Sequence, residues 1–301
     1  MAISSPVITL LAEPEESGAR PTDYYGSFKR LFHHSLDPIA SLNTGSYIRN
    51  YGTKGDLSIS WSSEDGPNDL VISSTLPSNH RAIQRLDISD TKDAVEKIIS
   101  RSPDNSSLRS WAKHSASLVH PQSGDLWSEL IPSVLGQRIT SKEASAQWRR
   151  LHDFCQGYIE PEALSQLSFV EFHRLGIEIG RARTLLAIAD AHDAIDKANE
   201  ISVDEAYQML LNIPGVGPWT ISEALRRSHG WLDAVSVGDF HLCHHVVFAL
   251  TGRHRGTDAE MLELLEPYRP CRWLVVDSIL RHAASPPRKS PGLPILDIRR
   301  F

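Results

Sequence analysis

Two stretches of the chain combine side chains and backbone groups that could do chemistry. The first is Leu210–Thr220, with the sequence Leu-Leu-Asn-Ile-Pro-Gly-Val-Gly-Pro-Trp-Thr, and the second is Val235–Leu242, which contains Asp239. Gly215 and Gly217 can adopt a positive φ without a Cβ penalty, so the chain can reverse within a few residues. Unpaired N–H groups at this turn and at the start of the next helix could hold an anion such as a phosphate.

Asp239 stands where a new helix is expected to begin. The helix dipole and the free N–H groups would keep its carboxylate ionised. A fixed carboxylate is useful in N-glycosidic cleavage, because the sugar becomes oxocarbenium-like as the base departs. The anion can then stabilise that charge or orient the attacking water. The residues alone leave a simpler alternative open, since Asp is also a favoured N-cap and a short glycine turn often joins two helices without binding anything.

In this order and spacing, the two stretches resemble the helix-hairpin-helix (HhH-GPD) DNA glycosylase superfamily, over roughly residues 108–284. Asp239 matches the aspartate of that family, although the proline often found just before the Gly-Asp pair is absent. The resemblance implies that the hairpin grips the DNA backbone. The hairpin residues expected at the DNA are Pro214, Gly215, Val216, Gly217 and Thr220.

The resemblance also implies a structural Na+ or K+ ion, bound by the backbone carbonyls of Leu211, Ile213 and Val216. No further cofactor is expected. The cysteines of the chain are Cys155, Cys243 and Cys271. They lie far apart and form no cluster after Asp239, so neither a disulfide framework nor an iron–sulfur cluster is expected.

A third stretch, Leu126–Ala146, resembles the segment of this family that ends one helix and starts another at the DNA surface. Gly136 would let the backbone turn closely, and Ser141 would cap the next helix. Gln137 and Arg138 would lie at the DNA. Arg138 is the expected wedge that fills the gap left by a flipped nucleotide, the alternative being an ordinary solvated arginine at a helix end.

Within the superfamily the chain looks most similar to 3-methyladenine DNA glycosylase II, the branch that removes alkylated purines. Trp219 stands at the hairpin position where bifunctional members carry a lysine that forms a Schiff base with the sugar. The resemblance therefore implies base removal by water, with no strand cleavage, in base excision repair. Two alternatives stay open: a glycosylase for another lesion such as uracil or hypoxanthine, and a non-catalytic protein that binds DNA through the hairpin.

Alkylated purines carry positive charge, which favours an aromatic pocket through stacking and cation–π attraction. Trp219 and Phe240 are the expected walls, with core packing as the alternative for each. Glu223 stands where relatives can have an aromatic residue, which predicts a more acidic pocket. Trp273 is expected in the core, because it shares a helical face with Val276 and Leu280. The i, i+4 pair His241 and His245 leaves a zinc site as a minor alternative.

The sequence predicts a mostly α protein: two helical subdomains flanking a cleft, with a smaller N-terminal α+β sheet domain. Residues 1–104 form the sheet domain, 105–284 the helical domain, and 285–301 a tail rich in proline and arginine. Strands are expected at 7–11, 46–51, 57–61 and 70–74, and a helix near 90–100. The helices expected after the 102–107 linker are 108–118, 125–138, 141–154, 161–166, 169–175, 181–198, 203–211, 218–228, 239–251, 258–268 and 271–284.

Composition sets the remaining expectations. The 301 residues are 41% hydrophobic and 23% charged, and these fractions are ordinary for a soluble globular protein. The net charge of −6 means that contacts with double-stranded DNA must come from a local patch or from backbone N–H groups. An acidic N-terminus unlike a signal peptide, the absence of a long apolar run and the scattered cysteines predict an intracellular, cytoplasmic monomer, associated with the nucleoid if bacterial.

Overall fold

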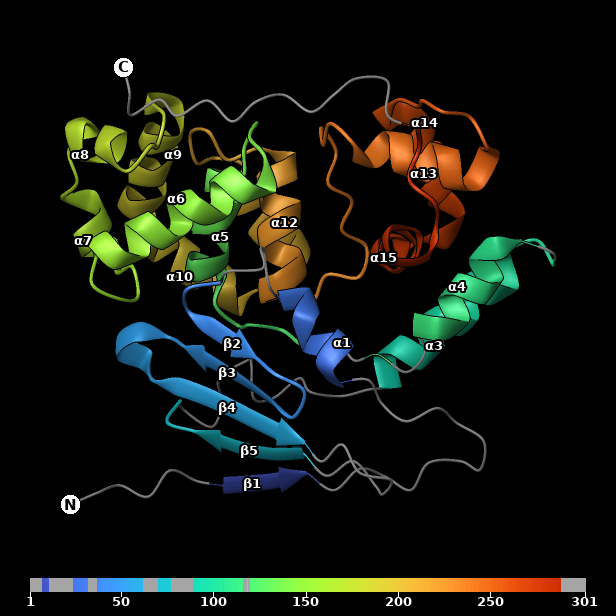
Figure 1. Cartoon of the computed structure of the whole chain (residues 1–301), viewed down its shortest axis with the longest axis horizontal. Helices are drawn as coiled ribbons and strands as arrows, with labels where there is room; N and C mark the ends of the chain where they lie inside the picture. The colour runs from blue at the N-terminus through green and yellow to red at the C-terminus, as the bar shows by residue number, and fades with distance from the viewer. Residues whose placement is uncertain are drawn as a thin grey trace.

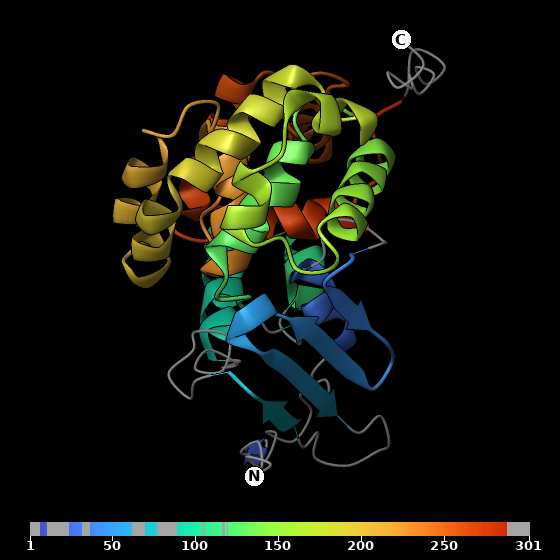
Figure 2. The ribbon, with the colours of Figure 1, turned by 90° about the vertical axis from the view of Figure 1, so that its left-hand side faces the viewer.

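A computed structural model describes residues 7–10, 24–31, 37–61, 70–76, 89–104, 106–115, 118 and 120–287. A small antiparallel sheet lies at one end of the molecule and helices form the rest (Figure 1). The same division is visible after a quarter turn, with the sheet below the helices (Figure 2). The predicted mostly α fold class is therefore confirmed. Most of the predicted tail, residues 288–301, lies outside the described residues.

The sheet has five strands in the order β1-β5-β4-β3-β2, all antiparallel. The strands are β1 (Val7–Leu10), β2 (Ala40–Leu42), β3 (Ser46–Asn50), β4 (Asp56–Trp61) and β5 (Leu70–Ser74). Tyr47, Ile59 and Ile72 are paired across three strands and are all buried on one face. The short helix α1 (Tyr24–Phe28) covers that face, and the ring of Phe28 stacks on Tyr47 with centroids 4.8 Å apart. The sequence did not predict β2, because three residues carry too little alternation to be recognised.

Short 3-10 turns complete this part of the chain. They are η1 (Lys29–Leu31), which continues α1, and η2 (Gly52–Lys54), which joins β3 to β4. The sequence of residues 28–34 has no periodicity that separates a helix from a strand. The structure shows the end of α1 followed by η1 there, and residues 32–34 lie outside the described part.

The sheet is fixed to the helices by a buried ion pair. Arg49 on β3 donates from Nη2 to Glu129 Oε1 at 2.7 Å and to Ser128 Oγ at 2.8 Å, and both charged side chains are 1% exposed. Glu129 lies on α5 (Leu126–Leu135). The Tyr51 hydroxyl adds a bond to the Ser123 carbonyl at 2.8 Å. Removing one member of such a buried pair would leave a costly unpaired charge, so the sheet and α5 hold one relative position.

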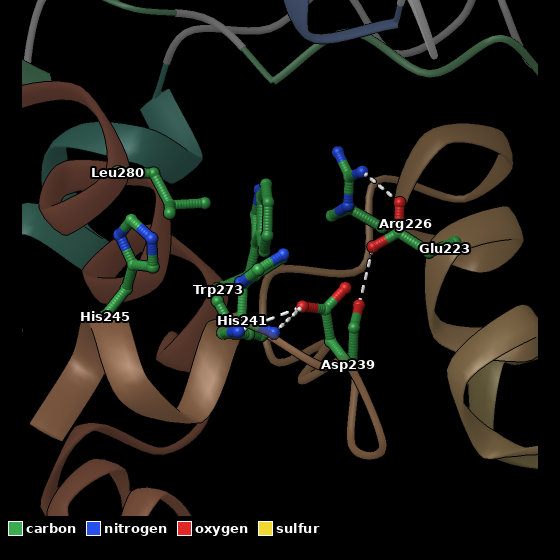
Figure 3. A pocket seen from close by; sticks show the side chains of 9 residues that line it. Glu223, Arg226, Asp239, His241, His245, Trp273 and Leu280 are labelled. Atoms are coloured by element: carbon green, nitrogen blue, oxygen red, sulfur yellow. Dashed lines mark hydrogen bonds and ion pairs between the residues drawn. The ribbon is translucent and has the colours of Figure 1, made fainter. Parts of the chain in front are cut away.

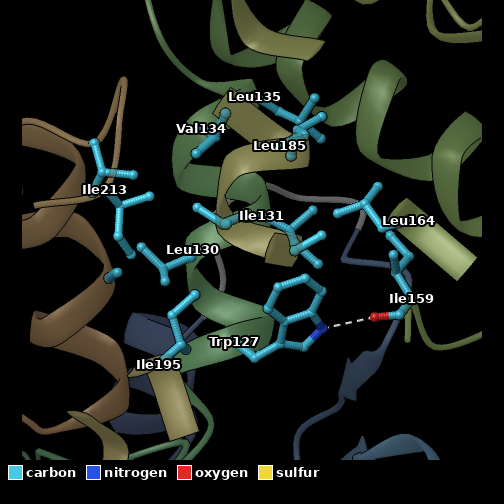
Figure 4. Close-up of a cluster of buried hydrophobic side chains, with 14 of the residues drawn as sticks. Trp127, Leu130, Ile131, Val134, Leu135, Ile159, Leu164, Leu185, Ile195 and Ile213 are labelled. Carbon is cyan, nitrogen blue, oxygen red and sulfur yellow. Dashed lines mark hydrogen bonds between the residues drawn. The ribbon is translucent and has the colours of Figure 1, made fainter. Parts of the chain in front are cut away.

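The first helical group surrounds α5, which is buried along its whole length. Its other members are α6 (Ser141–Phe154), α7 (Pro161–Ser165), α8 (Phe169–Arg174), α9 (Ile179–Asp190), α10 (His192–Glu200), α11 (Val203–Leu210) and α12 (Pro218–Ser228). Apolar side chains of α5 meet those of α9, α10 and the hairpin before α12, and Trp127 Nε1 donates to the Ile159 carbonyl at 2.7 Å (Figure 4). This group is the wall that carries the hairpin.

One predicted helix, residues 181–198, is in fact two. Helix α9 ends and α10 begins at Ala191, whose φ of −94° and ψ of 14° depart from helical geometry. Ile188 before the bend and Ile195 after it both belong to the buried cluster around α5.

The second helical group combines the two helices that follow the sheet in the chain with the helices near the end of the described residues. Its members are α3 (Ser89–Arg101), α4 (Ser107–Ser115), α13 (Leu242–Thr251), α14 (Asp258–Leu265), the 3-10 turn η3 (Glu266–Tyr268) and α15 (Arg272–His282). Val95 and Ile98 of α3 share a buried cluster with Leu274 and Val275 of α15. Helix α3 therefore packs with the helical part, and the expected linker at 102–107 is a short connection between two packed helices. In the described residues no helix has the length and apolar character needed to span a membrane.

Candidate active site

The hairpin between α11 and α12 is shaped by Gly215. Helix α11 begins with a capping box formed by Ser202 and Glu205, and α12 begins at Pro218 with Gly217 as its N-cap. Gly215 has a φ of 83°, and a Cβ there would lie 2.1 Å from Thr184 Oγ1 on α9. Both facts require glycine. Gly217 differs, because its φ is −106° and a Cβ would meet nothing within 4 Å.

The hairpin presents backbone donors to its surroundings. Within the described part of the chain, the N–H groups of Gly215 and Gly217 have no acceptor. They stand at the N-terminus of α12, a helix of 11 residues whose dipole favours an anion there. The side chains of Val216 and Thr220 are buried, so these two expected DNA contacts can be made only through the backbone.

Gln137 ties the turn between α5 and α6 to the hairpin. Its Nε2 donates to the Gly215 carbonyl at 3.0 Å and to Thr220 Oγ1 at 2.9 Å, while its own carbonyl accepts from Arg181 Nη1 at 3.1 Å. The side-chain Nε2 of Gln137 is therefore engaged within the protein, and its place at the DNA stays a prediction. Gly136 is needed for the same assembly, since a Cβ there would lie 3.1 Å from the ring of Trp219.

Arg138 projects from this assembly. It is exposed and has a φ of 57°, a conformation that costs a residue with a side chain about 1 kcal/mol or more. Helix α6 then begins with Thr140 as its N-cap, one residue before the predicted Ser141, and Thr140 Oγ1 accepts from the Glu143 N–H at 3.2 Å. A strained backbone held by rigid neighbours is a common way to aim a functional side chain.

Asp239 lies in the connection before α13 and is held by three donors. Its Oδ1 accepts the N–H groups of His241 at 2.8 Å and Leu242 at 2.9 Å, and its Oδ2 accepts from Trp219 Nε1 at 3.2 Å. Helix α13 starts at Leu242 and not at Asp239 as predicted, because Gly238, with a φ of 88°, turns the chain first. The carboxylate still receives the N–H groups of the first turn and stays half-exposed.

The loop that carries Asp239 is anchored from the second helical group. The N–H of Gly238 donates to Asp258 Oδ2 at 3.0 Å, at the start of α14. The N–H of Asp239 donates to the Ser236 carbonyl at 3.2 Å. The bonds from the Gly238 and Asp239 N–H groups therefore fix the loop, and with it the Asp239 carboxylate, before any ligand binds.

A cavity of about 230 Å³ opens beside Asp239, where the two helical groups meet (Figure 3). Residues of α12, α13 and α15 line the cavity, and the Asp239 loop closes one side. The lining residues are Glu223, Arg226, Ser236, Asp239, His241, Leu242, His245, Trp273 and Leu280. Its position agrees with the predicted cleft between two helical subdomains.

Comparison with solved structures agrees with this geometry, whereas no protein-family model and no curated sequence matches the chain. A 3-methyladenine DNA glycosylase from Archaeoglobus fulgidus superposes with a TM-score of 0.66 at 12% identity, covering 91% of this chain and 97% of that one. The chain has the helix-hairpin-helix DNA glycosylase fold.

Two further glycosylase structures were determined with DNA. The 3-methyladenine DNA glycosylase of Schizosaccharomyces pombe, in complex with abasic DNA, gives a TM-score of 0.55 at 20% identity and covers 63% of this chain and 95% of that one. The 8-oxoguanine glycosylase/lyase of Clostridium acetobutylicum, in complex with double-stranded DNA, gives 0.60 at 14% identity and covers 84% and 91%. These likenesses establish the glycosylase fold and leave the substrate open.

The aromatic wall of the cavity in this glycosylase fold is not the predicted one. Trp273 is 8% exposed and belongs to the buried cluster of the second helical group, as predicted, and it also lines the cavity. Phe240 is 77% exposed beside His241 and does not line the cavity, and Trp219 contacts Asp239 without lining it. Sequence spacing could not reveal that Trp273 lines the cavity, because the cavity forms only where α12, α13 and α15 come together. The backbone N–H of Trp273 donates to the Leu232 carbonyl at 2.8 Å at the start of α15.

Arg226 was also missed. Its guanidinium carbon lies 4.0 Å from the centroid of the Trp273 ring, and its Nη2 donates to Glu223 Oε2 at 2.8 Å (Figure 3). The only local signal is the i, i+3 spacing of Glu223 and Arg226 on one helix, which is typical of ordinary surface ion pairs. The contact with Trp273 could not be inferred from it.

Glu223 does not make the cavity acidic, contrary to the sequence prediction. Its carboxylate accepts from Arg226, from Arg227 Nη1 at 2.9 Å and from Ser236 Oγ at 2.6 Å. Burial by itself would raise the pKa of Glu223, but the two arginines and the Ser236 hydroxyl hold the pKa well below its ordinary value. Glu223 is therefore ionised, and two cations surround its charge.

Two metal questions remain from the sequence. His241 and His245 both line the cavity, and burial together with the neighbouring His241 lowers the pKa of His245. In the part of the chain that the structure describes, no cluster of three or more His, Cys, Asp or Glu side chains is arranged to hold a metal.

On the hairpin, the Ile213 carbonyl accepts the Val216 N–H at 3.1 Å and keeps a second lone pair. The monovalent cation at the carbonyls of Leu211, Ile213 and Val216 stays a prediction.

Proposed function

We propose that this chain is a DNA glycosylase that hydrolyses the N-glycosidic bond of a damaged base in double-stranded DNA and leaves the strand uncut. The observation that carries the proposal is the bond between Trp219 and Asp239. It joins a hairpin with free backbone donors to a fixed carboxylate at the rim of a cavity. One element can hold the phosphate backbone while the other faces the sugar of the same nucleotide.

DNA binding is assigned to backbone groups and to few side chains. The N–H groups of Gly215 and Gly217 would hold a phosphate, which suits a chain whose net charge is −6. Arg138 would enter the duplex as the damaged nucleotide rotates into the cavity. That rotation costs a few kcal/mol and costs least for a base that is already poorly paired.

The proposed reaction uses Asp239 and water. As the bond between C1′ and the base nitrogen breaks, its electron pair leaves with the base and positive charge develops on the sugar. The Asp239 carboxylate, held in place by the Trp219 indole and two N–H groups, stabilises that charge. The water oxygen then bonds to C1′. One water proton stays on that oxygen in the new hydroxyl group, and the other neutralises the charge that the departing base has taken with the electron pair.

A lyase step is not part of the proposal. Strand cleavage by this route needs an amine that forms a Schiff base with C1′. Trp219 occupies the hairpin position of that lysine, and among the described residues that line the cavity none is a lysine. We therefore propose that the enzyme is monofunctional.

The lesion predicted from sequence is an alkylated purine, and that prediction depended on aromatic walls formed by Trp219 and Phe240. The cavity contains neither ring, and Arg226 covers the face of the Trp273 ring that is there. This observation favours the second candidate, a glycosylase for a non-alkyl lesion.

The test is a panel of duplex oligonucleotides, each with one damaged base, incubated with the protein and divided before analysis. The proposal predicts strand breaks after hot alkali, which cleaves abasic sites, and intact strands without it. Strand cleavage without alkali would overturn the monofunctional assignment. Binding to all duplexes with no abasic sites in any of them would favour the non-catalytic DNA-binding alternative.

A further inference from the structure

We propose that the cavity beside Asp239 takes a neutral base that offers a carbonyl oxygen to Arg226, as deaminated and oxidised bases do, and that it discriminates against cationic alkylated purines. The inference rests on the proposed glycosylase function and adds the chemical class of its substrate. Arg226 is the residue that sets this preference.

The first argument is that the site for a cation is already filled. Trp273 supplies the one indole or phenyl ring among the described residues that line the cavity. The Arg226 guanidinium lies on that ring, 4.0 Å from its centroid. A cationic purine gains affinity by stacking on an electron-rich face. Here it would have to displace Arg226 or lie beside a like charge.

The second argument is that Arg226 cannot easily move away. Its side chain is 8% exposed, and Glu223 holds it at 2.8 Å. Glu223 is itself fixed by Arg227 at 2.9 Å and Ser236 at 2.6 Å. The carboxylate is thus shared by two arginines, and the wall formed by α12 carries excess positive charge. A cationic base stacked on Trp273 would meet repulsion from Arg226, and the Asp239 carboxylate is the group of the lining that would attract it.

The third argument is that Arg226 has donors to spare. A guanidinium carries five N–H donors. Within the described part of the chain Arg226 makes one hydrogen bond, from Nη2 to Glu223, which leaves the N–H groups of Nη1 as spare donors. Among the groups of a base, a carbonyl oxygen and a ring nitrogen are the acceptors that arginine contacts most often. A neutral base with a carbonyl would supply such an acceptor.

The contact also helps the chemistry that a neutral base requires. A cationic base leaves the sugar easily, whereas a neutral base departs with the negative charge of the bond's electron pair. A hydrogen bond from Arg226 to the base carbonyl stabilises that charge, while Asp239 stabilises the positive sugar. Water supplies the hydroxyl to C1′ and, overall, the proton that the base takes up. The departing base would face the positive Arg226, and the sugar would face the negative Asp239.

The experiment compares single-turnover excision from matched duplexes. Hypoxanthine, uracil and 8-oxoguanine are the neutral carbonyl bases, and N7-methylguanine and N3-methyladenine are the cationic ones. Hypoxanthine and N7-methylguanine form the most informative pair, because both carry the ring carbonyl at C6, whereas N7-methylguanine adds a positive charge, a methyl group and an exocyclic amino group. The proposal predicts that the wild type excises at least one neutral base faster than either cationic base, by on the order of tenfold or more.

Three variants separate specificity from folding. Arg226→Gln is expected to lower excision of the preferred neutral base on the order of 10- to 100-fold and to leave or raise excision of N7-methylguanine. Arg226→Lys keeps the charge without the planar donor pair and should recover only part of the activity. Arg227 is the other arginine partner of Glu223, and Arg227 itself does not line the cavity. The variant Arg227→Gln should therefore keep the preference for neutral bases.

Two results would overturn the inference: a wild type that prefers a cationic base, or an Arg226→Gln variant that loses both substrate classes equally. The wild-type preference decides the matter even if a variant does not fold. Failure of the proposed function looks different, because then no base is released from any duplex by the wild type.

Discussion

The indole Nε1–H of Trp219 donates to Oδ2 of Asp239 across 3.2 Å, joining residues that are 20 positions apart in the chain. Trp219 is the second residue of α12, directly after the hairpin, and its ring fills the space above Gly136. The position of the carboxylate is therefore set by the same element that is proposed to hold the phosphate. This geometric link is what makes the hairpin and the aspartate one site.

Substitution Trp219→Phe tests this link. Phenylalanine keeps a ring beside Gly136 but cannot donate to Asp239. We expect single-turnover excision to fall about tenfold or more, because a hydrogen bond to a charged group is lost, while duplex affinity stays the same. Rapid-quench measurement of excision, with binding measured in parallel by anisotropy, checks this. Equal loss of binding and excision would mean that Trp219 serves the hairpin and not the carboxylate.

The two hairpin glycines are expected to respond differently. Gly217→Ala adds a methyl group that meets no protein atom within 4 Å, so the fold should be unaffected. The methyl would stand between the hairpin and a phosphate, and we expect the Kd for duplex DNA to rise about fivefold. Gly215→Ala must clash with Thr184 and should lower the free energy of unfolding by about 1–3 kcal/mol.

Thermal unfolding and DNA binding of both glycine variants give the readout. A Gly217→Ala variant with unchanged affinity at low and moderate salt would show that DNA does not approach this part of the hairpin. A Gly215→Ala variant as stable as the wild type would contradict the packing against α9.

Arg138→Gly separates the wedge from backbone strain. Glycine adopts a φ of 57° freely, so we expect stability to rise by about 1 kcal/mol. Excision from duplex DNA should fall on the order of tenfold, because nothing fills the gap in the stack. Excision of the same base from a single strand should not change. A variant that loses activity on both substrates would exclude the wedge role.

These predictions show what local sequence could and could not reveal. The hairpin follows from short-range chemistry, since a capping box, a proline and a glycine needing positive φ all lie within one stretch. The contacts that finish the site are tertiary. Gln137 binding to Gly215 and Arg226 lying on Trp273 join residues far apart in the chain, and no periodicity encodes them. The spacing of Glu223 to Arg226 and Arg227 could be seen in the sequence, whereas the burial of all three side chains became evident only from the packed helices.

Asp37 should make stability depend on pH. Burial raises the pKa of Asp37 from 3.8 to about 7, with Arg49 opposing the rise. Between these values the folded chain holds a proton that the unfolded chain has lost. The free energy of unfolding therefore falls as pH rises from about 4 to 7, by at most about 4 kcal/mol, and stays low above that.

Asp37→Asn should remove this loss, raising the melting temperature at pH 8 more than at pH 5. Asp193→Asn is a suitable control, because that side chain is fully exposed. Calorimetry at both pH values measures the difference. An Asp37→Asn variant whose stability tracks the wild type at both values would mean that the carboxyl is ionised throughout.

Asp239→Asn is the most direct test of the proposed mechanism. The amide oxygen can still accept the N–H groups of His241 and Leu242, so the loop and the duplex affinity should be preserved. The negative charge facing the sugar is lost. With the base that the wild type excises fastest, we predict that single-turnover release falls on the order of 100- to 1000-fold, with the melting temperature and Kd close to those of the wild type. Full excision by this variant would contradict the role of Asp239 and the glycosylase mechanism built on it.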